Sequence, residues 1–225
     1  MPKTIIKLEN ISRSFLLDTY ENKVLKNIDI EILEGEFISI IGPSGSGKST
    51  LMNIIGCLDK PTSGKYFLDG VNVLSKKDKE LAGIRSKKIG FVFQSFNLIP
   101  RLSLSANVET PMIYARIKNR KQKATEILKK VGLGHRLNYK PSQISGGETQ
   151  RAAIARALVN NPKIILADEP TGNLDSKNGE EVLKIFRELN NKGVTVILVT
   201  HDANIANLAD RIIRLKDGEV EQNVQ

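Results

Sequence analysis

The chain has 225 residues, of which 26% are charged and 40% hydrophobic, and its formal net charge is +9. This composition argues against a disordered chain. It also argues against a membrane-spanning chain, because no apolar run approaches the roughly 20 residues that cross a bilayer. The segment MPKTIIKLEN lacks the apolar core of a secretory signal, and the single Cys57 cannot form an internal disulfide. We therefore expect a cytosolic α/β domain with a core of its own.

The positive charge has three possible meanings, namely a nucleic-acid partner, an anionic membrane surface, or neither. The lysines are spread along the chain, and the denser basic groups at 76–79, 85–88 and 118–123 are not interleaved with aromatic residues. We interpret the charge as a solvated surface, and contact with the inner face of a membrane is the next interpretation.

Alternating patterns predict strands at residues 4–9 and 24–32, and Gly35 turns the chain into a further strand at 37–41. The same reasoning predicts strands at 65–68, 71–74, 89–94, 163–169 and 194–202, helices at about 177–190 and 203–209, and a terminal hairpin at 211–221. The near-continuous apolar strands late in the chain are typical of a buried parallel sheet.

The pattern changes between about residues 95 and 160, where apolar residues recur at helical spacing. Ser145 and Glu148 have the spacing of a capping box, which predicts a helix over 145–158. We expect a helical lobe at about 95–160, inserted into an α/β core made of 1–94 and 161–225.

The segment GPSGSGKST follows a predicted strand and precedes a predicted helix, which is the context in which G-x-x-x-x-G-K-[ST] indicates a phosphate site. Glycines permit positive φ, so that successive N–H groups and the positive helix end form an anion cradle. Lys48 is placed to reach the β- and γ-phosphates, and the Ser49 hydroxyl to bind Mg²⁺. The predicted nucleoside-triphosphate ligands are Gly42, Pro43, Ser44, Gly45, Ser46, Gly47, Lys48, Ser49 and Thr50.

Polar side chains end three of the apolar strands: Gln94, the pair Asp168 and Glu169, and His201. Ligands bind at the carboxyl ends of the strands in a doubly wound sheet, so we expect these residues at the same crevice as Lys48. Asp168 is a candidate Mg²⁺ ligand, and Glu169 a candidate base for an attacking water. The alternative for Asp168 and Glu169 is a solvated turn, which the preceding apolar strand and the phosphate loop make less favourable. Taken alone, His201 would more often be a structural histidine.

A second glycine pair lies at a predicted helix start, in the segment ISGGE at residues 144–148. Ser145, Gly146 and Gly147 offer N–H groups and a helix dipole to another phosphate. Because one chain cannot easily wrap both loops around one nucleotide, the sequence favours a two-fold dimer with a triphosphate between the two chains.

Taken together, these motifs resemble the ATPase subunits of ATP-binding-cassette (ABC) transporters, over residues 5–219. The signature segment departs from the LSGGQ form at Ile144 and Glu148, and it keeps Ser145 and Gly147. The family's adenine-stacking aromatic falls at Phe15, with Tyr20 as the alternative. The family motifs match as follows: Gly42 to Thr50 the Walker A loop, Gln94 the Q-loop, ISGGE the signature, IILADE the Walker B strand, GNLD at 172–175 the D-loop, and His201 the switch histidine.

The resemblance implies a P-loop NTPase core, with a RecA-like mixed sheet, helices on both faces, N-terminal antiparallel strands and an inserted helical subdomain. It implies that two ATP molecules and two Mg²⁺ ions close two copies of the chain into a sandwich. It assigns the catalytic base to Glu169, the γ-phosphate and water contact to His201, and phosphate neutralisation to Lys48. It assigns the metal to Ser49, Gln94 and Asp168, and the partner's nucleotide to Ser145, Gly146, Gly147 and Glu148.

Residues 93–111 and 166–176 resemble the subgroup that serves lipoprotein-releasing and macrolide- or peptide-antibiotic exporters. This implies a membrane permease as partner, a place on the cytoplasmic face of the cell membrane, and no nucleic acid. The alternative is a soluble ABC ATPase that acts on nucleic acid or ribosomes, but the about 50 residues from Gln94 to Ser145 leave no room for its coiled coil. A small-molecule phosphotransferase would have no use for the segment 145–147.

Overall fold

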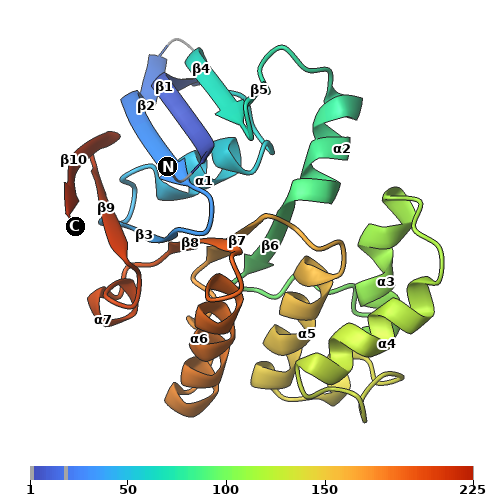
Figure 1. Cartoon of the computed structure of the whole chain (residues 1–225). Helices are drawn as coiled ribbons and strands as arrows, with labels where there is room; N and C mark the ends of the chain where they lie inside the picture. Colours follow the sequence, from blue (N-terminus) through green and yellow to red (C-terminus); the bar gives the residue numbers. More distant parts are fainter. Residues whose placement is uncertain (1–2, 18–19, 225) are drawn as a thin grey trace. The chain divides into compact units, whose positions relative to one another are not determined.

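A computed structural model describes residues 3–17 and 20–224 of the chain (Figure 1). The chain forms two compact units, Met1–Leu81 with Asn190–Gln225 and Ala82–Leu189. We name the first the phosphate-loop unit, since it contains residues 42–50, and the second the signature unit, since it contains residues 144–148. No helix in the described part of the chain combines the length and the apolar character needed to cross a bilayer.

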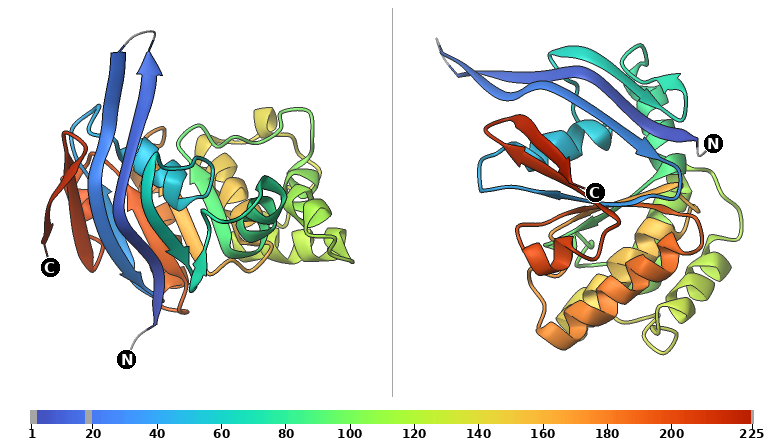
Figure 2. Two further views of the ribbon diagram at one scale, coloured as in Figure 1. Left: turned by 90° about the horizontal axis from the view of Figure 1, so that it is seen from above. Right: turned by 60° about the vertical axis from the view of Figure 1, so that its left-hand side comes forward.

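The phosphate-loop unit contains two sheets. Its strands and helices are β1 (Thr4–Leu17), β2 (Tyr20–Leu33), β3 (Phe37–Ile41), α1 (Lys48–Ile55), β4 (Ser63–Leu68), β5 (Val71–Asn72), β8 (Thr195–Val199), α7 (Ala203–Ala206), β9 (Arg211–Lys216) and β10 (Glu219–Val224). The antiparallel sheet has the order β2-β1-β4-β5, and the second sheet has the order β10-β9-β3-β8 in this unit. Helix α1 contacts both β2 and β8, so it packs between the two sheets (Figure 2).

The first two strands are longer than the sequence predicts. β1 and β2 pair from Thr4 opposite Leu33 to Leu17 opposite Tyr20, well beyond the predicted strands at 4–9 and 24–32. Register shifts interrupt this ladder, for example between Leu8 and Ile11, and each shift breaks the alternation of apolar and polar residues. The alternation in the sequence therefore does not reveal the full length of these strands, although their core side chains are buried.

The central strand β3 leads into the phosphate loop. It lies between β8 and β9 and runs parallel to both. Its residues Phe37–Ile40 and all of β8 are buried, which explains the near-continuous apolar runs of these strands. The parallel pairing places the carboxyl ends of β3 and β8 at one edge of the sheet, where the loop begins.

The signature unit combines two parallel strands with packed helices. Its elements are β6 (Ile89–Phe93), α3 (Leu104–Tyr114), α4 (Arg120–Lys130), the 3₁₀ turn η1 (Pro141–Gln143), α5 (Gly146–Leu158), β7 (Ile164–Asp168) and α6 (Ser176–Asn190). β6 runs parallel to β7, and α5 contacts β6 and the helices α3 and α4. The alanine-rich α5 permits this close packing, because Ala152, Ala153 and Ala155 are fully buried. The boundaries of the helical lobe, about 95–160, stay a prediction.

The helix α2 (Asp78–Lys88) was not predicted from the sequence. Its apolar residues form no stripe, since only Leu81 is buried. Asp78 and Glu80 in the first turn and Arg85, Lys87 and Lys88 in the last turn match the helix dipole, and this arrangement favours the helix without an apolar face.

Candidate functional site

The phosphate loop needs glycine at defined positions. Gly45 and Gly47 have φ of +80° and +100°, a region that favours glycine. A Cβ atom on Gly42 would lie 2.0 Å from the carbonyl oxygen of Leu215, and one on Gly47 would lie 2.8 Å from a methyl group of Leu25. Glycine therefore lets the loop pack closely against β9 and β2, and its positive φ lets successive N–H groups form a cradle for a phosphate.

Lys48 is the first residue of α1, and its ammonium group lies over the loop. Nζ donates hydrogen bonds to the carbonyl oxygens of Gly42, at 2.7 Å, and Pro43, at 2.9 Å. The N-cap of α1 is Gly47, which provides no side-chain acceptor for the first N–H groups of the helix. The loop, the cation and the helix end therefore fit the anionic oxygens of a triphosphate, and the exposed Ser49 fits a Mg²⁺ ligand.

His201 lies at the same sheet edge as the phosphate loop. Ile40 of β3 is in register with Val199 of β8, and the Thr200 N–H donates to the Ile40 carbonyl at 3.1 Å. The exposed His201 therefore follows its strand where the neighbouring strand enters the loop. The sequence prediction that these strand ends lie together is consistent with this placement.

Phe15 lies on β1 opposite Asn22 of β2, and its side chain is 37% exposed. The same β2 strand reaches the phosphate loop, because a Cβ atom on Gly47 would meet both Val24 and Leu25. The guanidinium carbon of Arg13 lies 4.4 Å from the centroid of the Phe15 ring. The side chain of Tyr20, the alternative stacking residue, lies outside the described part of the structure.

In the signature unit, Gln94 and Asp168 end neighbouring strands. Phe93 of β6 is in register with Asp168 of β7, so Gln94 follows directly beside it. Glu169 comes next in the chain and has a φ of +43°, an uncommon conformation for a residue with a side chain. Such strained backbone is concentrated at functional sites, and here it fixes the direction in which the chain leaves β7.

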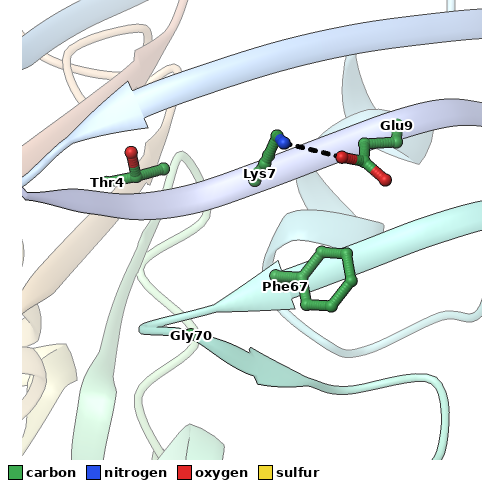
Figure 3. A pocket seen from close by; sticks show the side chains of 5 residues that line it. All are labelled: Thr4, Lys7, Glu9, Phe67 and Gly70. Carbon is green, nitrogen blue, oxygen red and sulfur yellow. Dashed lines mark ion pairs between the residues drawn. The ribbon is translucent and has the colours of Figure 1, made fainter.

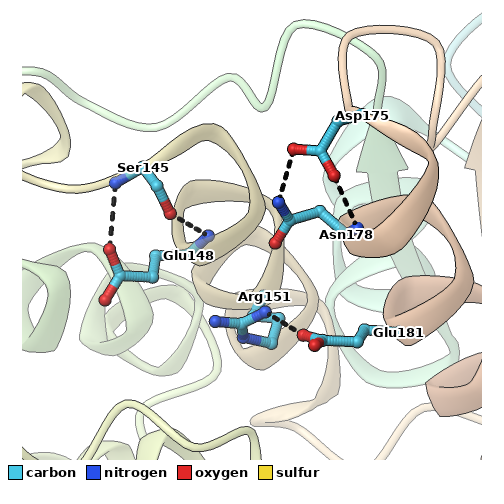
Figure 4. A network of polar contacts seen from close by, with 6 residues as sticks. All are labelled: Ser145, Glu148, Arg151, Asp175, Asn178 and Glu181. Carbon is cyan, nitrogen blue, oxygen red and sulfur yellow. Dashed lines mark hydrogen bonds and ion pairs between the residues drawn. The ribbon is translucent and has the colours of Figure 1, made fainter.

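The signature turn forms the capping box that the sequence predicts (Figure 4). The Glu148 N–H donates to Ser145 Oγ at 3.2 Å, and the Ser145 N–H donates to Glu148 Oε2 at 2.9 Å. Arg136 donates to Glu148 Oε1 at 3.1 Å. The N–H of Ser145, together with Arg136, holds the pKa of Glu148 below its usual value. Ser145 and Gly146 remain exposed at the N-terminus of a 13-residue helix, where an anion can bind.

The lowered pKa of Glu148 makes the stability of the signature turn pH-dependent. A lowered folded-state pKa contributes stability that is present above the ordinary value of 4.5 and is lost as the pH falls through the folded value. We expect Glu148→Gln, which keeps the capping-box hydrogen bond but not the charge, to be less stable than wild type at neutral pH. Urea denaturation across a pH series should show this difference shrink below pH 4.5; a difference that persists would contradict it.

Gly147 contacts the start of α6. A Cβ atom on Gly147 would lie 2.1 Å from Oδ1 and 2.9 Å from Cβ of Asn178. Asp175 fixes Asn178, accepting from its N–H at 3.0 Å and from its side-chain amide at 2.6 Å, and the pKa of Asp175 is lowered chiefly by the N–H bond (Figure 4). Arg151 of α5 donates to Glu181 of α6 at 2.7 Å. The signature helix and α6 are thus joined at two places.

We expect Gly147→Ala to destabilise the chain by about 1–3 kcal/mol, since overpacking forces neighbours to move. Asn178 cannot give way by rotating alone, because its Cβ also lies too close. Urea denaturation measures the loss, and Asn178→Gly in the same chain should restore part of it. Gly132→Ala is unsuitable as a control because of its positive φ, whereas Gly83, which has open space and no positive φ, is suitable. Equal stability of Gly147→Ala and Gly83→Ala would contradict the proposed contact.

Asn173, Gln150 and Arg156 hold the predicted motifs in place and were not themselves predicted as site residues. Asn173 and Gln94 exchange hydrogen bonds, from Asn173 Nδ2 to the Gln94 carbonyl at 3.0 Å and from Gln94 Nε2 to Asn173 Oδ1 at 3.4 Å. The buried Gln150 donates to the Pro170 carbonyl at 2.6 Å. Arg156 donates to the Phe96 carbonyl at 2.9 Å and also to Asn97, and burial lowers the pKa of its guanidinium. No local pattern reveals these long-range contacts, although the Asn in GNLD is visible in the sequence.

Comparison with known proteins agrees with these motifs. The family model described as ABC transporter matches residues 25–172. The ABC transporter ATP-binding protein YvrO of Bacillus subtilis is 56% identical over 218 residues, covering 96% of this chain and 95% of that protein. The macrolide export ATP-binding/permease protein MacB of Escherichia coli is 53% identical over 220 residues, which cover 97% of this chain but 34% of that longer protein.

A solved structure is similar over almost the whole chain. It is the dimeric post-hydrolysis state of the ATP-binding cassette MJ0796 bound to ADP and Pi; the protein MJ0796 comes from Methanocaldococcus jannaschii. Its TM-score is 0.90 at 50% identity, with 98% of each chain covered. The predicted P-loop NTPase fold is confirmed by this similarity, and the predicted family by the sequence matches. The chain belongs to the ABC transporter family, as an ATP-binding and ATP-hydrolysing cassette.

Proposed function

We propose that this chain is the ATPase subunit of an exporter-type ABC transporter, which dimerises around two Mg–ATP and drives a membrane permease. The observation that carries the proposal is the presence of two phosphate-binding elements in one chain, the glycine cradle at residues 42–50 and the exposed, capped helix start at Ser145. The dimeric cassette of MJ0796 and the fused permease of MacB support the two partners. The matched relatives give no support to a nucleic-acid function.

In the phosphate-loop unit, we assign nucleotide binding to the loop and to Phe15. The N–H groups of residues 42–50 and the Lys48 ammonium neutralise the β- and γ-phosphates, and Lys48 exchanges its carbonyl acceptors, Gly42 and Pro43, for phosphate oxygens. The Phe15 ring stacks on adenine. His201 donates to the γ-phosphate and holds the attacking water.

In the signature unit, we assign catalysis to the end of β7. Glu169 accepts a proton from water as its oxygen attacks the γ-phosphorus and the bond to the leaving oxygen of ADP breaks, which yields ADP and phosphate. Ser49, Gln94 and Asp168 would hold Mg²⁺, which supplies charge neutralisation of the phosphate oxygens. Ser145, Gly146, Gly147 and Glu148 are assigned to the nucleotide bound by a second copy of the chain. The capping box uses the N–H groups of Ser145 and Glu148, and the N–H groups of Gly146 and Gly147 are assigned to the γ-phosphate of that nucleotide.

The permease contact is assigned to the helical lobe at about 95–160, near Gln94 and α3. With that contact, we infer that the subunit is a peripheral protein on the cytoplasmic face of the cell membrane. The similarity to the macrolide export protein MacB favours an exporter or a lipoprotein-releasing system over an importer.

Co-purification from solubilised membranes tests this function. An affinity-tagged chain should retain a membrane protein, and ATP hydrolysis by the complex should exceed that of the chain alone. The variant Glu169→Gln should retain the same membrane protein without hydrolysis, which separates assembly from catalysis. Retention of nucleic acid in place of a membrane protein would overturn the proposal.

A further inference from the structure

The candidate adenine platform has a second layer. The guanidinium carbon of Arg13 lies 4.4 Å from the centroid of the Phe15 ring, within the range of a cation–π contact. Arg13 and Phe15 both lie on β1, and their stacking covers part of an aromatic ring that is still 37% exposed. One part of the ring is therefore held by the protein, and the rest is open.

Asp59 anchors the guanidinium. Arg13 Nη2 lies 2.9 Å from both carboxylate oxygens of Asp59, and the two side chains are 23% and 31% exposed. Asp59 is itself fixed, because its own N–H donates to the Asn53 carbonyl at 3.2 Å and its Oδ1 accepts from the Lys60 N–H at 2.8 Å. Within the described residues, Nε of Arg13 is buried without a hydrogen-bond partner, a cost that the stack and the ion pair offset.

The turn after α1 also holds the backbone of β1. The Ser14 N–H donates to Thr62 Oγ1 at 3.0 Å, and the Thr62 N–H donates to the Ser12 carbonyl at 2.8 Å. Side-chain and main-chain contacts from residues 59–62 therefore hold residues 12–14 in place. This turn follows the C-terminal end of α1, and the phosphate loop precedes the N-terminal end of the same helix at Lys48, so α1 links the loop to the turn that holds the strand carrying Phe15.

We infer that Arg13, held by Asp59, is a positioning residue for the adenine base. It fixes one face of the Phe15 ring so that the open part is already oriented when the nucleotide arrives. Orienting a side chain before binding removes its ordering cost from the binding free energy. The planar guanidinium suits this task better than an ammonium group, because it stacks and forms an ion pair at the same time. The inference rests on the proposed stacking role of Phe15.

The opposite possibility is that Arg13 covers the face on which adenine stacks and must leave first. The bonds to Asp59 argue against it, since displacement would leave the carboxylate without its cation. The two possibilities predict effects of opposite sign when Arg13 is removed.

Isothermal titration calorimetry with two ligands, Mg–ATP and Mg–tripolyphosphate, tests the inference. Tripolyphosphate offers the phosphates without a base. We expect Arg13→Ala to weaken ATP binding by about 3- to 10-fold, the size of a partly exposed cation–π contact, with tripolyphosphate binding unchanged. Asp59→Ala should give a similar loss of ATP affinity, and the double variant Arg13→Ala/Asp59→Ala should lose no more than either single variant. Arg13→Lys should give an intermediate loss. Lys7→Ala is the matched control, because it removes a cation from the same strand. Lys7 forms an ion pair with Glu9 at 2.7 Å, and both residues line the pocket shown in Figure 3.

Four results would overturn the inference. An equal loss for both ligands would make Arg13 a structural residue only, and tighter ATP binding by Arg13→Ala would make it a cover over the ring. The third is a further loss of ATP affinity when Arg13→Ala is added to Phe15→Ala, because without the ring Arg13 should have no effect on ATP affinity. If Phe15→Ala leaves ATP binding intact while Lys48→Ala weakens it, the proposed ATPase stands and the adenine platform, Arg13 included, is wrong.

Discussion

Glu169→Gln is expected to lower the rate of ATP hydrolysis by about 10²- to 10⁴-fold, because an amide cannot accept the proton of the attacking water. Mg–ATP binding should remain, since the change adds no volume and leaves the phosphate loop untouched. Glu and Gln at position 169 experience the same backbone strain, because φ at this position is +43°. Phosphate release measures the rate, and gel filtration should show a dimer that forms only with ATP, because unhydrolysed nucleotide keeps two copies together.

Glu181→Gln is the matched control for this variant. It makes the same chemical change in the same unit, at a half-exposed carboxylate that pairs with Arg151 at 2.7 Å. We expect its hydrolysis rate to match wild type, since exposed ion pairs contribute little. Hydrolysis by Glu169→Gln at the wild-type rate would remove Glu169 from the role of catalytic base.

Lys48→Ala is expected to weaken Mg–ATP binding by about 10²- to 10⁴-fold, because hydrogen bonds to charged groups contribute ~1.5–3 kcal/mol each and Lys48 is assigned to two phosphates. The fold should persist, since Nζ bonds only loop carbonyls, those of Gly42 and Pro43, within the described structure. Calorimetry measures the affinity, and circular dichroism checks the fold.

Lys60→Ala provides the control for charge. Lys60 lies beyond the end of α1, pairs with the exposed Asp78 at 3.0 Å, and is half-exposed. Lys60→Ala should leave the ATP affinity unchanged, although it lowers the net charge by the same amount as Lys48→Ala. Unchanged affinity in Lys48→Ala would contradict the assignment of the cradle to the triphosphate.

The elements that the sequence predicts well are those whose cause is local. The phosphate loop depends on glycines and a lysine within nine residues of chain, and the capping box on Ser145 and Glu148, three positions apart. Each of these patterns carries its own physical reason. The structure reproduces both, including the positive φ of Gly45 and Gly47.

Features that depend on distant partners could not be predicted. The stack of Arg13 on Phe15 needs Asp59, and the fixed position of Gln94 needs Asn173, 79 residues away. Register shifts hide the length of β1 and β2, and charge at both ends, in place of an apolar stripe, hides α2. In each case the missing information is which segments meet, and periodicity along one segment does not contain it.

The reciprocal bonds of Gln94 and Asn173 have a consequence for exchanging parts between relatives. A Cβ atom on Gly172 would lie 2.7 Å from Gln94 Nε2, so the small residue at 172 and the amide at 173 are both matched to this glutamine. A chimaera that receives residues 93–111 from another transporter therefore needs residues 172–173 from the same donor. Gln94 and residues 172–173 are thus a matched set, although Gln94 and Asn173 lie 79 residues apart in the chain.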